Sequence, residues 1–398
     1  MKLLFTMHMP YLPALGGANK TIRYLTEALA LRKHSVVVIV PAFGEPPGGV
    51  TEEQFFDEQE KFGIRSTLNQ GAYVFHLNDV EVHAVADAAR VSLYLTSQID
   101  KIQPDYIIVA AEDITQVLLK ASLSVRKCPV ICIAQTPSLL PFGSHSFNPD
   151  PQKTSILKQV DAFVVNSQFL SNYVHQWIDI KAIPIYLPAY GKPPFPNFVN
   201  FESGFITLVN PCQFKGISIF IKLAEKLPNF EFAAVPTWGT TYQDRVLLER
   251  ISNISLLEPS SDFDQILSQT RILLVPSLWL ENIPLVIIEA MLRGIPVICS
   301  NVGGIEEVNL GTGFMVAVKP IERVTHSFNQ NKTIIPLVPD QEIQPWYDAV
   351  LQLLSNRELY YQQSNLVRSA SYQFVSQIKI ESFEDFLRSN FGQLTIWD

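Results

Sequence analysis

The feature that most restricts the fold is a series of short, nearly continuous apolar runs, each followed by signals for a helix. In the first half of the chain these runs lie at 2–7, 36–41, 106–111, 129–134 and 162–167. Apolar runs of this kind are typical of strands in a parallel sheet that helices cover on both faces. The pair Gly16 and Gly17 follows the first run, before a helix that we expect Asn19 or Thr21 to cap. This order predicts a βαβ unit, the usual start of a doubly wound sheet.

A second series of the same kind begins after a proline-rich stretch at 187–203, with strands expected at 205–210, 230–235, 271–277, 296–300 and 313–318. We therefore predict an α/β protein in which two Rossmann-like domains face each other across a cleft, with ligands at the carboxyl ends of the strands. The predicted parts are an N-terminal domain at 1–190, a linker at 191–203, a C-terminal domain at 204–370, and a helical segment at 371–398 that packs back on the N-terminal domain. The polar stretch 45–70 interrupts the first series, and we interpret it as a long loop or lid.

The composition excludes several classes of protein. With 47% hydrophobic and 17% charged residues, the chain is too apolar for disorder and can fill two buried cores. Its net charge of −8 argues against a protein built mainly to bind nucleic acid. Its four cysteines form no disulfide framework, and we expect buried, reduced thiols in a cytoplasmic protein.

The sequence gives little indication of a membrane protein. No apolar stretch reaches the roughly 18 residues of a membrane span, and a histidine and two prolines interrupt the apolar N-terminus. Lys120, Arg126 and Lys127 form a small basic cluster, which leaves peripheral contact with anionic lipid open.

The segment 275–308 carries the most specific pattern. A strand is expected to end at its start, Glu281 follows in a loop, and Pro284 suits the first position of a helix. The backbone amides at 285–287 would then point to the strand ends and form an anion site. Glu289 lies within this apolar helix, where a carboxylate is costly unless it meets a polar partner such as a ligand hydroxyl.

This segment resembles the donor-binding signature of the GT-B retaining glycosyltransferases, in particular glycosyltransferase family 4. The resemblance consists of Ser277 and Glu281 in Ser-x-x-x-Glu, the E-x(7)-E spacing to Glu289, the run EAM-x-x-G-x-P-V-I, and the glycine pair after it. It extends over most of the chain, with runs similar to the family at 16–41 and 164–174.

The resemblance implies roles for particular residues. Glu289 would bind the ribose hydroxyls of the nucleotide, Glu281 would lie by the donor sugar, and Lys215 would grip the diphosphate. The implied donor-binding set is Gly17, Asn210, Lys215, Glu281, Asn282, Ile283, Leu285, Val286 and Glu289, with Glu281 and Lys215 as the catalytic residues. A lysine and helix N-terminal amides can stabilise a leaving diphosphate, so we expect no metal and no other cofactor.

The chain departs from the family pattern at four places. Pro284 stands where the family often has a glycine, and the turn at 235–241 replaces the family's usual glycine-rich turn. The family usually has an arginine five residues before the lysine, where this chain has Asn210. Many members have a histidine after the strand at 129–134, where this chain has Gln135 and Thr136, and the nearest histidine is His145. The candidates for contacts with the acceptor or the sugar are His8, Gly16, Thr136 and His145.

Structural interpretations of these residues stay open. Glu281 could be a solvated loop acid, Lys215 a surface lysine, and Glu289 could pair with Arg293 one helical turn away. The string Asp262-Phe-Asp264 matches the metal-binding motif of another glycosyltransferase fold, but its context indicates a helix start.

We therefore predict a retaining glycosyltransferase that moves a sugar from a nucleotide sugar to a hydroxyl acceptor of unknown class. The C-terminal domain at 204–370 would bind the nucleotide-sugar donor, and the N-terminal domain at 1–190 would bind the acceptor. A UDP-sugar is favoured on family frequency alone. Asn210 and the missing histidine motivate an alternative, a non-catalytic protein that binds a nucleotide sugar or a partner protein. A nucleotide-sugar epimerase or a phosphorylase on the same fold is a further alternative. Trp238, Tyr242 and Trp279 are candidates for stacking on the sugar or the base, although each could equally serve in packing.

Overall fold

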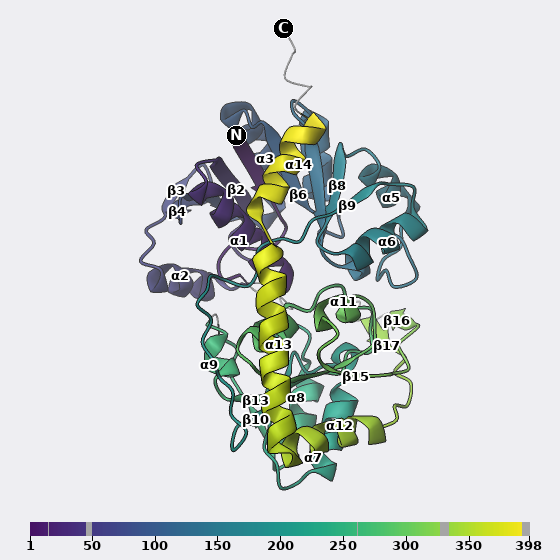
Figure 1. Ribbon diagram of the computed structural model, residues 1–398. Helices are drawn as coiled ribbons and strands as arrows, with labels where there is room; N and C mark the ends of the chain where they lie inside the picture. The colour runs from purple at the N-terminus through teal and green to yellow at the C-terminus, as the bar shows by residue number, and fades with distance from the viewer. Residues whose placement is uncertain (15, 45–49, 261, 327–333, 392–398) are drawn as a thin grey trace. The chain divides into compact units, whose positions relative to one another are not determined.

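The computed structural model describes residues 1–14, 16–44, 50–260, 262–326 and 334–391. The chain divides into two compact units (Figure 1): unit 1 is Met1–Gly191 with Ile378–Asp398, and unit 2 is Lys192–Gln377. Each unit contains a largely parallel sheet of its own and is described by itself, and the predicted α/β class is confirmed.

Unit 1 is built on a nine-stranded sheet in the order β3-β4-β5-β2-β1-β6-β7-β8-β9. Its strands are β1 (Lys2–Thr6), β2 (Ser35–Pro41), β3 (Thr67–Asn69), β4 (Ala72–Leu77), β5 (Val80–Val85), β6 (Tyr106–Ala110), β7 (Val130–Ala134), β8 (Ala162–Val165) and β9 (Ala182–Pro184). The sheet is parallel from β5 through β2, β1, β6, β7 and β8 to β9, and β3 and β4 extend it in antiparallel fashion. The central strands β1, β6 and β7 are buried almost throughout, as their continuous apolar runs predict.

The helices of unit 1 are α1 (Gly17–Leu31), α2 (Glu52–Lys61), α3 (Val91–Ile102), α4 (Val117–Val125), α5 (Pro151–Leu157), α6 (Gln168–Trp177) and α14 (Ile380–Phe391). The prediction that Asn19 or Thr21 caps α1 is wrong, because the helix begins at Gly17 after Gly16 and has no side-chain cap. Gly16 has φ 84° and ψ 162°, a backbone conformation open almost only to glycine.

The interpretation of 45–70 as a long loop or lid is wrong over 52–61, which forms α2, and over 67–69, which forms β3; residues 45–49 lie outside the described residues. The helix starts with a capping box between Thr51 and Gln54, a signal that the sequence carries. Phe55 is 1% exposed, and its ring packs against Phe43 and Tyr73 at centroid distances of 5.4 and 5.6 Å. Thus Phe55 belongs to the core of unit 1.

Unit 2 is built on a six-stranded parallel sheet in the order β12-β11-β10-β13-β14-β15. These strands are β10 (Phe205–Val209), β11 (Phe232–Val235), β12 (Ile254–Leu256), β13 (Thr270–Val275), β14 (Val297–Ser300) and β15 (Phe314–Val316), with a separate antiparallel pair, β16 (Val324–His326) and β17 (Ile334–Pro336). The helices are α7 (Ile217–Lys226), α8 (Tyr242–Glu249), α9 (Asp264–Leu267), α10 (Leu285–Leu292), α11 (Ile305–Asn309), α12 (Gln344–Ser355) and α13 (Arg357–Gln377).

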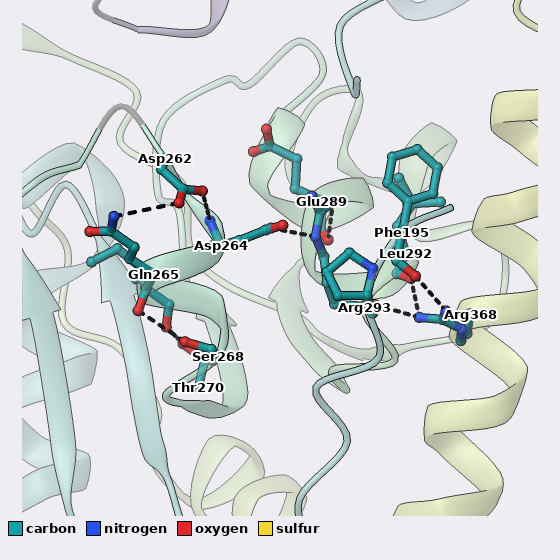
Figure 2. A network of polar contacts seen from close by, with 12 residues as sticks. Phe195, Asp262, Asp264, Gln265, Ser268, Thr270, Glu289, Leu292, Arg293 and Arg368 are labelled. Carbon is teal, nitrogen blue, oxygen red and sulfur yellow. Dashed lines mark hydrogen bonds and ion pairs between the residues drawn. The ribbon is translucent and has the colours of Figure 1, made fainter. Parts of the chain in front are cut away.

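The proline-rich stretch after 191 packs on unit 2. Arg368 of α13 donates hydrogen bonds to the carbonyls of Phe195 (2.9 Å) and Leu292 (2.5 Å), as Figure 2 shows. The Phe198 amide donates to the Arg293 carbonyl at 2.9 Å. Because α13 runs without a break to Gln377, the segment that continues with unit 1 begins at Ile378.

Helix α14 packs on unit 1 through a buried charge. Glu384 is 2% exposed, and its carboxylate lies 2.7 Å from both Arg32 Nε and His34 Nε2. Hydrogen bonding to Arg32 is the main cause that lowers the pKa of Glu384 to about 2. Tyr106 of β6 adds a hydrogen bond to the Leu387 carbonyl at 3.1 Å.

The parallel strands of each sheet have one point at which the chain order reverses. In unit 1 the chain order reverses between β1 and β6, and in unit 2 it reverses between β10 and β13. In open parallel sheets, ligands bind outside the carboxyl ends of the strands at such a switch point. No described helix is both long enough and apolar enough to cross a membrane.

Candidate functional site

The switch point of unit 2 brings two predicted catalytic residues together. Lys215 follows β10 and Glu281 follows β13, and the Lys215 ammonium forms an ion pair with Glu281 Oε1. Ser277 Oγ donates a hydrogen bond to the same carboxylate oxygen at 2.8 Å. The side chains of Lys215 and Glu281 are 24% and 16% exposed, so the pair is partly accessible to a ligand. This geometry rules out the interpretation of Lys215 and Glu281 as independent surface charges.

Close backbone contacts fix the loops that carry this pair. A Cβ on Gly216 would lie 2.0 Å from the Pro276 carbonyl oxygen, and a Cβ on Gly303 would lie 2.1 Å from the Glu281 carbonyl oxygen. Gly216 and Gly303 also have φ values of +74° and +60°. Only glycine satisfies both conditions. The Gly304 amide donates to the Glu281 carbonyl at 2.9 Å, which holds the Glu281 loop against the end of β14.

Helix α10 begins beside this loop. Pro284 is its N-cap and not its first residue, which corrects the prediction by one position. The Ile287 amide donates to the Pro284 carbonyl at 3.1 Å. The Ile287 amide therefore already has an acceptor, so the predicted anion site would depend on the amides of Leu285 and Val286.

Glu289 is buried in α10 at 5% exposed. The alternative in which it pairs with Arg293 is not what the structure shows, because Arg293 Nε donates to Asp264 Oδ1 at 2.7 Å. Arg293 Nη1 contacts only the backbone carbonyl of Glu289, at 3.2 Å. Figure 2 shows the Glu289 carboxylate turned away from the guanidinium. Asp264 of the Asp-Phe-Asp string is thus engaged by Arg293 and begins α9.

The Asn210 side chain forms a hydrogen bond with a neighbouring turn. It has φ 59°, a left-handed conformation that asparagine tolerates better than most residues. Its Oδ1 accepts a hydrogen bond from the Gly239 amide at 2.9 Å, which holds the turn after β11. Trp238 in this turn and Tyr242 after it are 57% and 77% exposed, whereas Trp279 is buried and packs edge-on against Phe214.

The remaining predicted residues lie in unit 1. Gly16 and Gly17 are exposed at the start of α1. His8 follows β1, and burial lowers its pKa, an effect that the Asp113 charge opposes. Thr136 precedes a short 3₁₀ turn after β7. His145 lies further along the same loop, where its Nδ1 is 2.8 Å from the hydroxyl of its neighbour Ser144.

Sequence reasoning missed one acid in unit 1. Glu112 follows β6 at the switch point and is 8% exposed. Its Oε1 accepts a hydrogen bond from the Gln135 amide at 2.8 Å, and Gln135 Nε2 donates to the Ala18 carbonyl at 3.1 Å. Burial raises the pKa of Glu112 to about 7, although hydrogen bonds from the Gln135 amide and its own amide oppose this. The available signal was an acid directly after a buried central strand.

Two family models match the chain, one in each unit. Residues 15–187 match the model described as Glycosyltransferase Family 4, and residues 204–356 match the one described as Glycosyl transferases group 1. Together the two models cover most of the chain, which therefore belongs to the GT-B glycosyltransferases. No curated protein sequence matches it significantly.

Solved structures share the fold of this glycosyltransferase over almost its whole length. Sucrose-phosphate synthase from Thermosynechococcus elongatus is 15% identical with a TM-score of 0.69, covering 99% of this chain and 100% of its own. HepE from Anabaena, solved with UDP and glucose, is 15% identical with a TM-score of 0.68, covering 98% and 100%. TarM from S. aureus is 10% identical with a TM-score of 0.66, also covering 98% and 100%.

Other groups of this glycosyltransferase have structural partners. Two cations of the predicted basic cluster are paired: Arg126 with Asp161 at 2.6 Å, and Lys127 with Asp100.

All four cysteines are unbridged, and three of them are buried. The described residues contain no group of three or more histidine, cysteine or acidic side chains that could hold a metal ion.

Proposed function

We propose that the protein is a metal-independent, retaining glycosyltransferase that transfers a sugar from a UDP-sugar to a hydroxyl acceptor. The observation that carries this proposal is the group of Lys215, Glu281 and Ser277 at the switch point of unit 2, next to the start of α10. The group combines a cation, a carboxylate and helix amides, which are the parts that binding and activating a sugar diphosphate require.

The proposed roles follow from charge and position. A bound diphosphate would compete with Glu281 for the Lys215 ammonium, and the amides of Leu285 and Val286 would add donors to it. Glu281 would then accept hydrogen bonds from the donor sugar, and buried Glu289 would bind the ribose hydroxyls. Because positive charge faces the leaving group, the site stabilises the charge that develops there.

In the proposed reaction the bond between the sugar's anomeric carbon and the diphosphate oxygen breaks, and a bond to the acceptor oxygen forms on the same face. The acceptor's proton passes to the leaving phosphate, which departs as the nucleoside diphosphate. Lys215 stabilises that leaving group and needs no metal for this purpose. HepE, which shares the fold, has been solved with UDP and UDP-glucose, and this supports UDP as the first nucleotide to test.

A thermal-shift experiment tests the donor site directly. Wild type and Glu289→Ala are melted with UDP, GDP, ADP, CMP and dTDP. A ligand at 100 times its Kd stabilises the protein by about 2.7 kcal/mol, a rise on the order of 5–10 °C for units of this size. We expect a shift with UDP that Glu289→Ala abolishes. The absence of a shift with every nucleotide, in well-folded protein, would refute the proposal.

Activity measurements then test metal independence and retention of the anomeric configuration. UDP-sugars with acceptor mixtures should release UDP equally well with and without EDTA, and the product's anomeric configuration, read by NMR, should match the donor's. EDTA-sensitive turnover would refute metal independence. Inverted product would refute retention.

Asn210 favours a second candidate function, a protein that binds a nucleotide sugar without turning it over. The family's second diphosphate cation is absent at this position, and the asparagine is engaged by Gly239. A UDP shift with no UDP release from any donor–acceptor pair would favour this candidate. An epimerase would change the donor sugar without releasing UDP.

A further inference from the structure

The outer edge of the sheet in unit 1 is only partly covered. The edge strand β3 lies beside β4 (Figure 1), but it pairs only with residues 72–74 of that strand. Before Thr67 the chain leaves the sheet, so residues 75–77 of β4 have no described strand on their outer side. A cavity of about 600 Å³ lies at this place.

This cavity lies between two segments of unit 1, and we call it the edge groove. Residues 62–65, which follow α2, and Thr67 line one side of it. Residues 74–78, from β4 and the turn after it, line the other side. Its volume is in the range of ligand-binding sites, about 300–1,000 Å³. The groove is therefore large enough to hold a short segment of another chain.

The backbone of His76 faces the edge groove with unpaired groups. The two-residue turn Asn78-Asp79 joins β4 to β5, so Leu77 and Val80 form the first hydrogen-bonded pair of that hairpin. Because hydrogen bonding alternates along an antiparallel strand, the amide and the carbonyl of His76 point away from β5 and toward the groove. Neither group has a partner in the described part of the chain. Such an open edge can pair with a further strand.

Exposed apolar side chains gather beside this open edge. Phe62, which lines the groove, is 44% exposed, and Leu68 of β3 is 63% exposed. Leu68 lies opposite Tyr73, whose ring is 5.4 Å from the ring of the exposed Phe56. An added strand would cover these side chains with its own, because neighbouring strands bring their side chains into contact.

The charge of the edge groove favours an acidic partner. Its lining residues include Arg65 and His76 and no acid, although the whole chain has a net charge of −8. Arg65 is exposed and forms no ion pair with a described residue. Two cations beside the groove are already paired: Lys61 with Glu58 at 3.3 Å, and Arg23, which lies over the Phe62 ring, with Glu27 at 2.8 Å.

The acids near the groove are also accounted for. Glu81 Oε2 lies 3.8 Å from His76 Nε2, so this carboxylate offsets the charge of the imidazole when it is protonated. Asp79 follows the lining residues in the exposed turn, and Glu60 is exposed on α2. Arg65 is therefore the cation of the groove that is left to bind a carboxylate of a partner.

We propose that the edge groove binds an extended, acidic segment of a partner protein, which pairs with β4 as an additional strand at His76. The backbone of the segment bonds to the amide and the carbonyl of His76, and one of its carboxylates pairs with Arg65. Its apolar side chains cover Phe62 and Leu68. Main-chain pairing supplies affinity in this mode of recognition, and the side chains supply specificity. The inference concerns unit 1 alone and does not depend on the proposed donor chemistry.

The probe is the peptide EVEFEVE, blocked at both ends and labelled with fluorescein, in which acids and apolar residues alternate as on the two faces of a strand. Fluorescence anisotropy measures its binding to the full chain. Two comparison peptides separate the contributions. The peptide KVKFKVK reverses the charge, and a form of EVEFEVE with N-methylated backbone amides cannot pair with a strand edge.

His76→Pro tests the strand pairing, because proline removes the amide that faces the groove but no hydrogen bond to β5. His76→Ala is its matched control, since it keeps that amide and removes only the imidazole. Arg65→Glu tests the charge. Its control is Arg90→Glu, which reverses another exposed arginine of unit 1 that does not line the groove. Circular dichroism and thermal melting check the folding of each variant.

We expect saturable binding of EVEFEVE to wild type, His76→Ala and Arg90→Glu. His76→Pro and Arg65→Glu should each weaken it by about tenfold or more, since a lost hydrogen bond or ion pair at a binding edge costs about 1.4 kcal/mol or more. Both comparison peptides should bind wild type more weakly by a similar factor. If His76→Pro does not fold, the N-methylated peptide still tests the strand pairing.

The other outcomes overturn the inference. If EVEFEVE does not bind to folded wild type, or if KVKFKVK binds equally well, the partner is not an acidic segment. If the N-methylated peptide binds as well as EVEFEVE, strand pairing is refuted. Light scattering after size exclusion tests a different occupant: a wild-type dimer that His76→Pro disrupts, without peptide binding, would show that a second copy of this chain occupies the groove in place of a partner.

Discussion

The two switch points use opposite electrostatics at the same topological position. In unit 2, Lys215 and Glu281 form a partly exposed ion pair that glycine contacts hold in place. In unit 1, Glu112 is an almost fully buried acid with a raised pKa, on a loop that contains no cation. A cation paired with a carboxylate can exchange that carboxylate for a phosphate, whereas a buried acid that is easily neutralised suits an uncharged hydroxyl. The comparison shows that one sheet topology can place groups of opposite electrostatic character at its switch point.

The largest effect should come from removing the cation. Lys215→Ala leaves Glu281 without its ion-pair partner and the diphosphate without its main charge, so kcat should fall about 10²–10³-fold, as for other electrostatic groups of active sites. Lys222→Ala, an exposed lysine on the following helix α7, should leave kcat unchanged. Steady-state UDP release measures both. If kcat fell less than threefold in Lys215→Ala, Lys215 would not be the cation that the proposed donor site of unit 2 requires.

The glycine contacts of unit 2 should matter for stability. Gly303→Ala places a Cβ 2.1 Å from the Glu281 carbonyl oxygen, so the free energy of unfolding should fall by at least about 3 kcal/mol. Gly311→Ala is the matched control, because it has a similar φ of +66° but no atom within 4 Å, and should cost only about 1 kcal/mol. Urea unfolding measures the difference. Equal losses would mean that backbone strain alone explains both.

The buried acids of unit 1 should make its stability depend on pH in opposite directions. The folded pKa of Glu112 is raised to about 7 from 4.5, so folding binds a proton, and stability that is present below 4.5 is lost as the pH rises to 7. This loss is on the order of 3 kcal/mol. Glu112→Gln should abolish it. For Glu384, with a pKa of about 2, stability is present above 4.5 and is lost as the pH falls toward 2.

Urea unfolding of wild type, Glu112→Gln and Glu384→Gln between pH 3 and 8 separates these two windows. If Glu112→Gln had the same pH dependence as wild type between 4.5 and 7, the buried acid would not be the feature that distinguishes the switch point of unit 1.

The sequence predicted the parts of this fold that periodicity encodes. Each apolar run proposed as a strand is a strand, because a buried parallel strand requires a continuous apolar stretch. The strands β4 and β5, which pair antiparallel with each other, were missed, although the Asn78-Asp79 pair between them, with φ values of 50° and 65°, is a turn signal. The helix α2 was missed because its polar face dominates the composition, and only its capping box and Phe55 mark it.

The candidate sites differ in the same way. The proposed donor residues Glu281 and Glu289 were found in the sequence because they belong to a motif with fixed spacing, and Lys215 was found as a basic residue before a glycine at the start of the second domain. Glu112 was not, since a single acid after a strand has no motif, and its significance depends on burial and on the position of β6 beside β1. That pairing is set by long-range strand order, which local sequence does not specify.

The smallest effect should come from Asn210, where unit 2 lacks a cation. Asn210→Ala loses the hydrogen bond to the Gly239 amide and places alanine at φ 59°, which should cost about 1–2 kcal/mol of unfolding free energy. Asn210→Asp keeps an oxygen for that amide, so it should be nearly as stable as wild type. If the Asn210 amide nitrogen also faces the diphosphate, Asn210→Asp should nevertheless weaken UDP binding more than Asn210→Ala does, because it adds a negative charge there. Urea unfolding of the two variants measures how much Asn210 stabilises the turn, and UDP titration measures how much it contributes to ligand binding. Equal UDP affinities in both variants would leave Lys215 as the sole proposed diphosphate contact of these two residues, and unit 2 would then have a donor site with a single cation.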